Sequence, residues 1–556
     1  MSRAIRAFLS VVCLATAVFA QSGNQGSITG TVTDASGAVV PKANVTATNK
    51  QTSTQFTTTT SDQGAYTFPV LQVGDYELKV NGGGFAENKR DVRVSIGAKL
   101  TVDVRLTTGA QTENVNVTDE LPAIETTRTQ VSNNLNEQQI RELPANGRNF
   151  IDFALLTPGV GRDVRTGDLS FAGQRGTLNS LTVDGADNNN TFFGQTIGRT
   201  GSGRAPYQFS QDAVQEFQVI SSSYTAEQGR AGGAVINVIT KSGTNAFHGS
   251  IFEYYRDRGL AANDPVLKQN TRIATPGAAQ PRKPGYHFNQ FGGTLGGPIV
   301  KDKLFFFFNY DGQRNTQLQT TSLQLPVIAA PTAQQTDAIN YLTARSAAYT
   351  RGLNQNAFLA KGDWNISQRH QLSLRYNRQN FTGKNFENGG INQAIEHTGN
   401  SLVKTDSGTA QLTSSFGARI VNVGRFQYQI DSEPGQANSN NPEATVSLGG
   451  TSFIVGRNSF SPRETTIKRQ QYADTLTWAR GSHTFKFGAD ILHDNILNFF
   501  PGNFSGLYSF ANLQSFGCSL EGIPLDGSNL ACPSSSGNQL REAFAGTGTS
   551  GPKTQP

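Results

Sequence analysis

The amino-acid sequence predicts a mainly β protein with three parts: an N-terminal β-sandwich, a mixed α/β domain and an incomplete antiparallel transmembrane β-barrel. Three observations support this fold class. The chain opens with a secretory signal, no later segment resembles a transmembrane helix, and apolar and polar residues alternate with period two through the second half. Because a closed barrel is the other way to satisfy backbone groups in lipid, this alternation predicts barrel strands.

The first twenty residues have the pattern of a signal peptide. Arg3 and Arg6 precede an apolar stretch, residues 7–20, that ends in Val-Phe-Ala. The alternative is a short membrane anchor, but the stretch is too short to cross a bilayer comfortably and no stop-transfer pattern follows. We therefore expect residues 1–20 to be removed on secretion.

The charge balance argues against nucleic acid as a partner. The chain has 47 Lys and Arg against 41 Asp and Glu, a formal net charge of +6, and loss of the two signal arginines leaves +4. There is no basic cluster with interleaved aromatic residues. The hydrophobic content of 36% suits barrel strands, which expose only alternate residues to lipid.

Residues 26–108 predict a small β-sandwich. Val102 and Val104 alternate with polar residues, and turn residues recur at short spacing, as in residues 34–37 and 61–64. The segment resembles the carboxypeptidase regulatory-like domain. The matching positions are Gly30, Val32, Asp34, Gly37, Pro41, Ala43, Val45, Gly64, Tyr66, Phe68, Leu71, Gly74, Tyr76 and Leu78. In that resemblance the domain is a folding and interaction module, which implies no catalysis.

Residues 121–240 predict a mixed α/β domain. Asn136 is suited to cap a helix that runs through Leu143 and stops at Pro144, and a second helix is expected over residues 149–156. Further along, Asp212 and Gln215 have the spacing of a capping box, which predicts a helix just before a valine-rich strand.

Two motifs in this domain carry a family resemblance. One is a strand and turn that contains Arg175, Gly176, Leu181, Val183, Asp184 and Gly185. The other is a glycine-led strand that contains Gly232, Gly233, Val235, Asn237, Val238, Ile239 and Thr240. Both resemble the plug domain of TonB-dependent outer-membrane transporters. The resemblance implies that residues 121–240 form a plug inside a barrel.

Residues 109–120 link the sandwich to this plug. The stretch is extended and polar, and it resembles a TonB box formed by Glu113, Asn114, Val115, Asn116, Val117 and Thr118. Such a strand would add to a sheet edge of an inner-membrane energy-transducing TonB-type protein, which could then pull it. A plain linker strand fits the same residues.

Oxygen-rich side chains follow the first motif. Asp184, Asp187, Asn188, Asn189 and Asn190 could ligate calcium, since oxygen ligands suit hard cations. Their spacing is not that of an EF-hand. The favoured interpretation is a turn in which Asp and Asn side chains bond their own backbone, so no metal site is assigned.

Residues 243–556 predict barrel strands. Large apolar side chains alternate with polar ones in residues 372–376, 426–430 and 485–491, as expected when one face meets lipid and the other a lumen. Residues 291–314 closely resemble an early-barrel hairpin of the Oar-like group of these transporters. A buried hairpin of a soluble sandwich fits less well, because the alternation continues for hundreds of residues.

Cys13 leaves with the signal peptide, so the mature chain keeps Cys518 and Cys532. In an oxidising compartment these two can form a disulfide, which would close a loop of about fifteen residues and stabilise the fold by roughly 3 kcal/mol. The alternative is two unpaired cysteines in a loop.

The resemblance is incomplete in the barrel. The family barrel has about 22 strands, whereas residues 243–556 offer about nine or ten candidates of roughly ten residues each. Half a barrel would leave two unpaired strand edges in lipid. We therefore expect this sequence to be an N-terminal portion of a longer transporter.

The sequence shows no motif for catalysis or for cofactor binding. The six histidines form no H-E-x-x-H pair, and there is no phosphate-binding G-x-x-x-x-G-K-[ST] loop or G-x-S-x-G elbow. A G-x-G-x-x-G occurs at Gly546, Gly548 and Gly551, but no strand precedes it and no helix follows. We expect neither an enzyme nor a cofactor.

Two hypotheses about function follow. The first is an outer-membrane TonB-dependent receptor or transporter, in which the plug gates active uptake or export of a solute and faces the periplasm together with the sandwich. The alternative is a surface adhesion protein without transport. Dependence on the proton-motive force would distinguish them. Loops rich in Asn, Gly, Ser and Thr lean weakly toward glycans or peptides as the solute.

Overall fold

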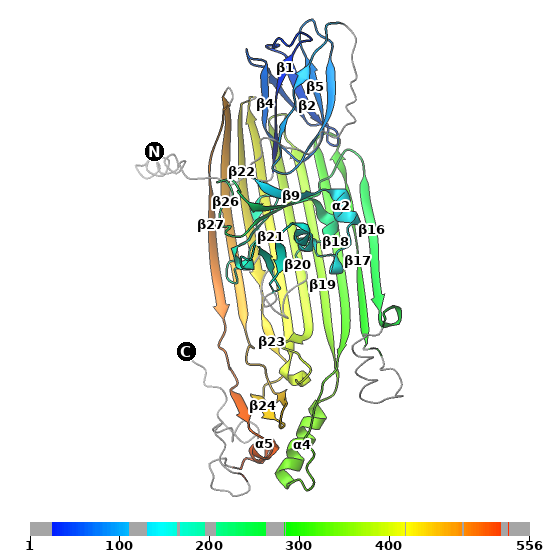
Figure 1. The fold of residues 1–556 in the computed structure, drawn as a ribbon, viewed down its shortest axis with the longest axis vertical. Coiled ribbons are helices and arrows are strands. Elements are labelled where there is room, and N and C mark those ends of the chain that lie inside the picture. The colour runs from blue at the N-terminus through cyan, green and yellow to red at the C-terminus, as the bar shows by residue number, and fades with distance from the viewer. Residues whose placement is uncertain are drawn as a thin grey trace, which may run out of the picture.

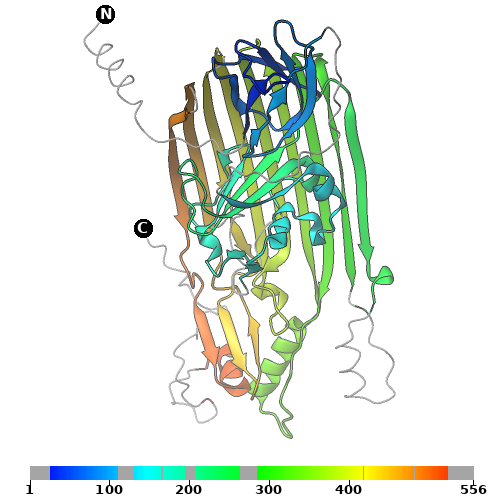
Figure 2. The same cartoon turned by 45° about the horizontal axis from the view of Figure 1, so that its top comes forward.

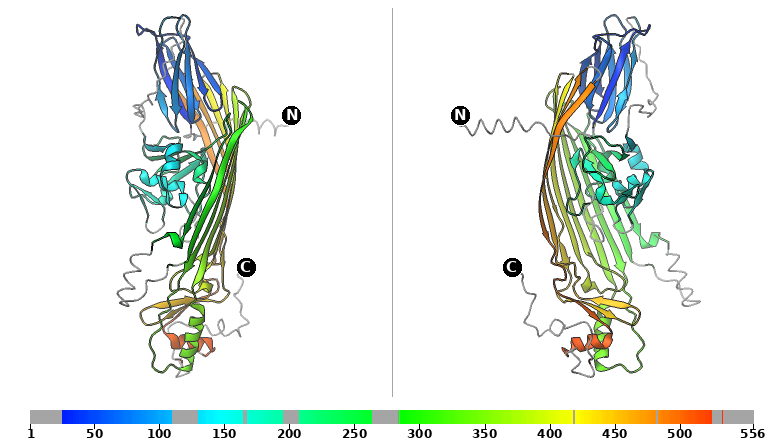
Figure 3. Two further views of the ribbon diagram at one scale, coloured as in Figure 1. Left: turned by 90° about the vertical axis from the view of Figure 1, so that its right-hand side faces the viewer. Right: turned by 60° about the vertical axis from the view of Figure 1, so that its left-hand side comes forward.

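The structure is a computed structural model that describes residues 25–109, 130–163, 167–194, 207–262, 283, 285–417, 419–480, 483–523 and Cys532. Its main feature is a long curved antiparallel sheet, with the mixed α/β domain on one face and the sandwich at one end (Figure 1). The name plug is kept below for the described part of this α/β domain, residues 130–240. Turned views show the plug on the concave side (Figures 2 and 3). In the described ranges no helix has the length and apolar character needed to cross a membrane. The expected signal peptide lies outside these ranges.

Nine long strands form the main sheet, each paired with its neighbours in chain order. They are β16 (His248–Asp257), β17 (Tyr286–Val300), β18 (Leu304–Gln319), β19 (Tyr349–Asn365), β20 (His370–Glu387), β21 (Gly399–Phe416), β22 (Ile420–Ser432), β26 (Glu464–Arg480) and β27 (His483–Phe499). The short β23 (Gly435–Ala437) pairs with β21. Within the described ranges, β16 and β27 are the two edges of this sheet. The hairpin expected in residues 291–314 is β17–β18.

The two faces of this sheet differ as the alternation predicts. On β22, Phe426 and Tyr428 are 41% and 39% exposed on the convex face, whereas Gln427 and Gln429, which alternate with them, are 1% and 5% exposed. Polar inward side chains thus lie beneath the plug, and aromatic ones face outward. The predicted mainly β fold class, with a large antiparallel sheet in the region of the expected barrel strands, is confirmed.

The sandwich consists of two small sheets, with strand orders β4-β1-β7 and β3-β2-β5-β6, and β8 also pairs with β1. Buried alternate residues such as Ile28, Val45, Tyr76 and Val94 fill the space between the sheets. The strands are β1 (Gly26–Thr33), β2 (Asn44–Asn49), β3 (Gln55–Thr59), β4 (Ala65–Leu71), β5 (Gly74–Asn81), β6 (Asn88–Val94), β7 (Lys99–Thr101) and β8 (Val104–Arg105).

The described part of the plug, residues 130–240, contains a five-stranded sheet of order β13-β12-β15-β14-β9. Strands β12 and β15 are parallel, and the other pairs are antiparallel. The strands are β9 (Val131–Leu135), β12 (Ser180–Val183), β13 (Ala186–Asp187), β14 (Val214–Ser222) and β15 (Val235–Thr240); β10 (Val160–Arg162) and β11 (Leu169–Phe171) form a separate pair. Phenylalanines 150, 153, 209 and 217 form much of the core beneath the sheet.

Two of the three helices predicted in the plug are present. Helix α2 (Glu137–Glu142) begins at Asn136, which forms a capping box with Gln139. The second is a 3-10 helix, η2 (Phe150–Leu156), capped by Asn149. Single 3-10 turns occur at η1 (Asn146–Arg148) and η3 (Gly176–Leu178).

The prediction of a helix from the spacing of Asp212 and Gln215 was wrong. Only one 3-10 turn, η4 (Gln211–Ala213), occurs there, and it is capped by Ser210. Gln215 already belongs to β14, because pairing of β14 with β15 begins at Val214 and overrides the local capping signal. Asp212 instead forms an ion pair with Arg148.

A small distal module lies at the end of the main sheet opposite the sandwich (Figure 1). It comprises α4 (Ala333–Arg345), β24 (Glu443–Ser447), β25 (Ser452–Val455), β28 (Leu507–Phe510) and α5 (Leu513–Leu520) around one apolar core. The turn η6 (Ile395–His397) contacts β25 of this module, whereas η5 (Arg258–Leu260) follows β16. The structure joins Cys518 of α5 to Cys532 by a disulfide, with 5.9 Å between the Cα atoms.

Candidate functional site

The plug meets the barrel wall at the turn between β12 and β13. Asp184 and Gly185 have φ of 49° and 77° between the paired residues Val183 and Ala186, which is the geometry of a tight two-residue hairpin turn. The carbonyl oxygen of Gly185 accepts a hydrogen bond from Nη1 of Arg425 at 2.6 Å. A Cβ atom on Gly185 would lie 2.4 Å from Nη2 of Arg425. Only glycine therefore fits this turn against the wall.

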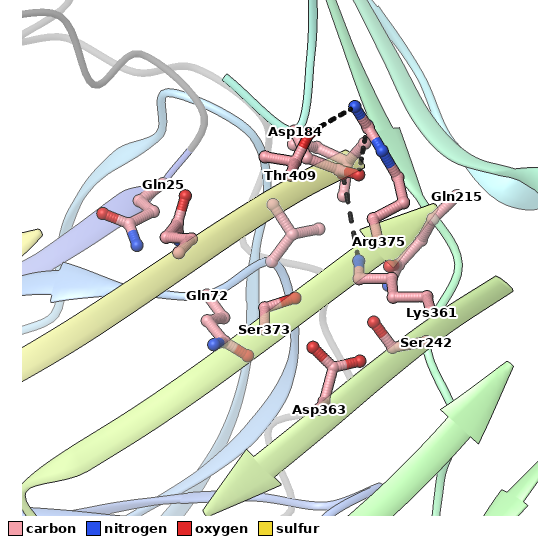
Figure 4. Close-up of a pocket in the computed structure, with 13 residues that line it drawn as sticks. Gln25, Gln72, Asp184, Gln215, Ser242, Lys361, Asp363, Ser373, Arg375 and Thr409 are labelled. Carbon is pink, nitrogen blue, oxygen red and sulfur yellow. Dashed lines mark hydrogen bonds and ion pairs between the residues drawn. The ribbon is translucent and has the colours of Figure 1, made fainter. Parts of the chain in front are cut away.

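The Asp184 carboxylate lies between two barrel cations. It accepts a hydrogen bond from Nη1 of Arg375 at 2.7 Å and lies 3.9 Å from Nζ of Lys361 (Figure 4). It also accepts hydrogen bonds from the backbone N–H and the hydroxyl of Thr240, at 2.9 and 2.7 Å. Burial tends to raise the pKa of Asp184, but the positive charges of Lys361 and Arg375 and the bonds from Thr240 hold it below its usual value. Asp184 is thus a charged contact between plug and wall.

A second ionic contact lies at Asp187. Asp187 forms an ion pair with Arg469 of β26, and these side chains are 3% and 1% exposed. Arg469 also donates to Asp494 of β27 at 2.9 Å, and Arg230 of the plug lies 3.1 Å from Asp187. Removing one partner of this buried pair would leave the other charge without compensation, so the contact is sensitive to substitution.

The side chains of the oxygen-rich loop form hydrogen bonds to the loop's own backbone and to the barrel wall. The backbone N–H of Asn189 donates to Asp187 at 3.1 Å, and that of Phe193 donates to Asn190 at 3.0 Å. Nδ2 of Asn190 lies 3.2 Å from Asp431 on the wall. Among the residues that the structure describes, no group of three or more His, Cys, Asp and Glu side chains could hold a metal ion.

A third contact involves residues that the sequence motifs did not indicate. Tyr207 and Ser210 donate hydroxyl hydrogen bonds to Asp311 of β18, at 2.6 and 2.7 Å. Gln355 and Gln379 both donate to the carbonyl oxygen of Tyr207 at 2.6 Å. Burial and the Asp311 carboxylate raise the pKa of the Tyr207 hydroxyl well above its usual value, so it remains a donor. The available signal was an acidic residue at an inward position of a barrel strand.

A small cavity of about 70 Å³ lies where sandwich, plug and wall meet (Figure 4). Its polar lining includes Gln25 and Gln72 of the sandwich, Asp184 and Ser242 from the plug side, and Lys361, Asp363, Ser373 and Arg375 of the wall. Gln25 Nε2, Asp363 Oδ2 and Arg375 Nε are buried without a protein partner in the described structure. A polar cavity of this size with unpaired donors and acceptors has room for several water molecules.

The other predicted motif residues serve the plug itself. Val183 lies in the plug core. A Cβ atom on Gly176 or Gly233 would lie 2.4 Å from Asp168 or Asn179, so both positions require close packing. The N–H groups of Gly232 and Gly233 both donate to the carbonyl oxygen of Leu178. Arg175 is exposed, and the candidate TonB box, residues 113–118, lies outside the described residues.

Residues 239–338 and 324–555 match the family described as outer membrane beta barrel domain. The chain belongs to this outer-membrane β-barrel family. The family places it in the outer membrane, and residues 27–107 match the carboxypeptidase regulatory-like domain. Over 305 residues the chain is 32% identical to the TonB-dependent transporter Oar of Myxococcus xanthus, covering 53% of this chain and 27% of Oar.

Solved structures with a similar arrangement include the outer membrane transporter YddB from Escherichia coli, at 13% identity and a TM-score of 0.48, covering 66% of this chain and 48% of YddB. Another is the siderophore receptor PirA from Acinetobacter baumannii, at 16% identity and a TM-score of 0.45, covering 67% of this chain and 49% of PirA. The chain matches about half the length of these solved proteins and about a quarter of Oar.

Proposed function

We propose that the protein acts as a TonB-dependent outer-membrane receptor or transporter whose plug gates the passage of a solute. The observation that carries this proposal is the polar character of the plug–wall interface at Asp184, Asp187 and Tyr207. Hydrogen bonds at such an interface can be exchanged for bonds to water as the plug shifts, so moving it costs less than separating an apolar core. The cavity beside Asp184 has room for water at that boundary.

In this proposal the sandwich and plug face the periplasm, and the distal module faces outward. Residues 113–118 add as a strand to an inner-membrane energy-transducing protein of the TonB type, which pulls on the plug. The name of the relative Oar, a TonB-dependent transporter, supports this partner. A glycan or peptide solute suits the amide-rich loops. No residue is assigned a catalytic, cofactor or metal role.

The test uses the intact gene product in its own outer membrane. Ser242→Cys would place a thiol in the cavity, while Cys518 and Cys532 are joined in a disulfide and do not react. We expect labelling of this thiol by an impermeant maleimide to increase in energised cells, and to fall when a protonophore is added or residues 113–118 are deleted. Thr57→Cys, exposed on the sandwich, should label equally in all conditions.

The same experiment separates the adhesion alternative. An adhesion protein has no need of the proton-motive force, so its Ser242→Cys labelling would be the same with and without protonophore. If the variant lacking residues 113–118 reaches the membrane at normal levels and keeps energy-dependent labelling, then pulling through this segment is wrong.

A further inference from the structure

The plug sheet carries one polar row across all five of its strands. The row consists of directly paired residues, in the order Asn134, Gln218, Asn237, Thr182 and Asp187. Paired residues point to the same face of a sheet, and neighbours along each strand point to the other. The adjacent row is Leu135, Phe217, Val238, Val183 and Ala186, all buried and apolar. The sheet therefore has an apolar face toward the plug core and a polar face away from it.

Hydrogen bonds fix the side chains in the centre of this polar row. Thr182 donates from its hydroxyl to Oδ1 of Asn237 at 2.7 Å, and Nδ2 of Asn237 donates to Oε1 of Gln218 at 3.0 Å. With its oxygen so occupied, Gln218 presents its Nε2 donor to whatever covers the sheet. Gln218 and Asn237 are 0% and 3% exposed, so this face is covered.

The cover is a turn of the sandwich. Nε2 of Gln218 donates to the carbonyl oxygen of Ile96 at 3.0 Å, and the N–H of Ile96 donates to Oε2 of Glu216 at 2.6 Å. Glu216 lies two residues before Gln218 on β14, is 1% exposed, and belongs to the same face. Both polar backbone groups of the buried Ile96 are thus satisfied by plug side chains, which is a specific joint rather than loose contact.

The sandwich is also attached to the barrel side. Gln72 donates to Gln371 at the start of β20 at 3.1 Å, and Asn365 at the end of β19 donates to Thr54 at 2.9 Å. The N–H of Asn245, which follows the plug, donates to the carbonyl oxygen of Gln51 at 2.9 Å. The sandwich therefore bridges the plug and the wall around the cavity of Figure 4.

We propose that the N-terminal sandwich is a latch that holds the plug in the barrel, seated on Glu216 and Gln218 and positioned by Asn237. The same rigid sandwich is hydrogen-bonded both to β14 and to the wall. The plug therefore moves only after the bonds to β14 or the bonds to the wall have broken. Asn237 is a positioning residue, since it acts through Gln218. The proposal rests on the proposed function, in which the plug moves.

The first experiment measures docking alone, by hydrogen exchange on the purified full chain. Glu216→Ala and Gln218→Ala should each speed exchange of the amides of residues 95–98 about ten-fold, as expected on loss of a hydrogen bond to a charged or fully buried group. Asn237→Ala should have a smaller effect in the same direction. Glu216→Gln keeps an acceptor for Ile96 and should retain most of the protection.

Glu142→Ala is the matched control, because Glu142 lies on the plug helix α2 with its side chain 58% exposed. It should leave residues 95–98 unchanged. Unchanged exchange of α2 and β15 in every variant shows that the plug remains folded. Equal protection of residues 95–98 in wild type, Glu216→Ala and Gln218→Ala would overturn the latch.

The second experiment asks whether the joint restrains the plug. In the intact gene product, Glu216→Ala combined with Ser242→Cys should increase maleimide labelling in cells without a proton-motive force, whereas Glu142→Ala should not. Looser docking without any change in labelling would show that the sandwich does not restrain the plug. The proposed gating is tested separately, by the protonophore and by deletion of residues 113–118. Failure of the latch can therefore be distinguished from failure of the gating.

Discussion

Arg425 of β22 donates a hydrogen bond to the carbonyl oxygen of Gly185 at 2.6 Å, and its guanidinium occupies the space that a side chain at position 185 would need. The neighbouring Asp184 is bound by Arg375 of β20. One two-residue turn of the plug is therefore gripped by two strands of the wall, through a backbone group and a carboxylate. This makes the turn the point at which plug docking is most sensitive to substitution.

Gly185→Ala is expected to weaken plug docking. The substitution combines strain at φ of 77° with a contact of 2.4 Å to Arg425, so its cost should exceed the roughly 1–2 kcal/mol of an unfavourable φ alone. Gly173→Ala separates the two effects, because Gly173 has φ of 79° but its Cβ would meet nothing within 4 Å. Protection of β12 and β13 from hydrogen exchange measures the loss. Equal losses in the two variants would show that the fit to Arg425 is unimportant.

Asp184 and Arg375 should be energetically coupled. Asp184→Ala leaves two buried barrel cations without their partner, a change that costs about 3–5 kcal/mol for a buried pair. The double variant Asp184→Ala/Arg375→Ala should therefore cost less than the sum of the two single variants. A double-mutant cycle, measured as the urea concentration at which the plug becomes sensitive to protease, gives the coupling. Additive effects would mean that the ion pair contributes nothing to docking.

Docking of the sandwich should weaken as the pH rises from about 5 to neutral. Burial raises the pKa of Glu216 above its usual value of 4.5, while Ile96, Ser95 and Arg93 act against this rise and Asp75 adds to it. A raised folded-state pKa contributes stability that is complete below the unfolded value and is lost as the pH passes the folded value. Exchange of residues 95–98, corrected for its intrinsic pH dependence, should therefore speed up toward neutral pH.

The control for this pH effect is Glu216→Gln, which cannot titrate. Its corrected exchange should be the same at pH 5 and pH 7.5. If the variant and the wild type show the same slope, the pH dependence comes from another group and the assignment to Glu216 is wrong.

The sequence was most informative where a pattern has a local cause. Period two on the barrel strands, the cap at Asn136 and the tight Asp184–Gly185 turn all follow from rules that operate within a few residues. The same rules failed at Asp212, where pairing of β14 with β15 decided the structure and the side chain found Arg148 instead. A local capping signal cannot report a sheet partner that is remote in the chain.

The site itself could be predicted only in part. Gly185 and Asn237 stood out as motif residues. Their structural roles depend on contacts with Arg425 and Gln218, which are 240 and 19 positions away in the chain. Glu216 looked like an ordinary polar residue on an alternating strand, because its role depends on a sandwich turn 120 residues earlier. Contacts between domains leave no periodic trace in a single sequence, so this part of the site required the structure.

The distal module should lose stability in acid because of His397. This side chain is 4% exposed, and burial lowers its pKa to about 4 from 6.5, while a hydrogen bond from the imidazole to the backbone of Gly456 opposes the shift. Oε2 of Glu443 lies 4.0 Å from Nδ1 of His397. A depressed folded-state pKa contributes stability that is complete above pH 6.5 and is lost as the pH falls toward 4, by up to about 3 kcal/mol. Corrected hydrogen exchange of β24 and β25 should therefore accelerate over this range.

His397→Gln should remove the pH dependence, whereas His483→Gln, at an exposed position on β27, should keep it. A wild-type profile that is flat between pH 6.5 and 4 would contradict the assignment, because a buried neutral imidazole must resist protonation.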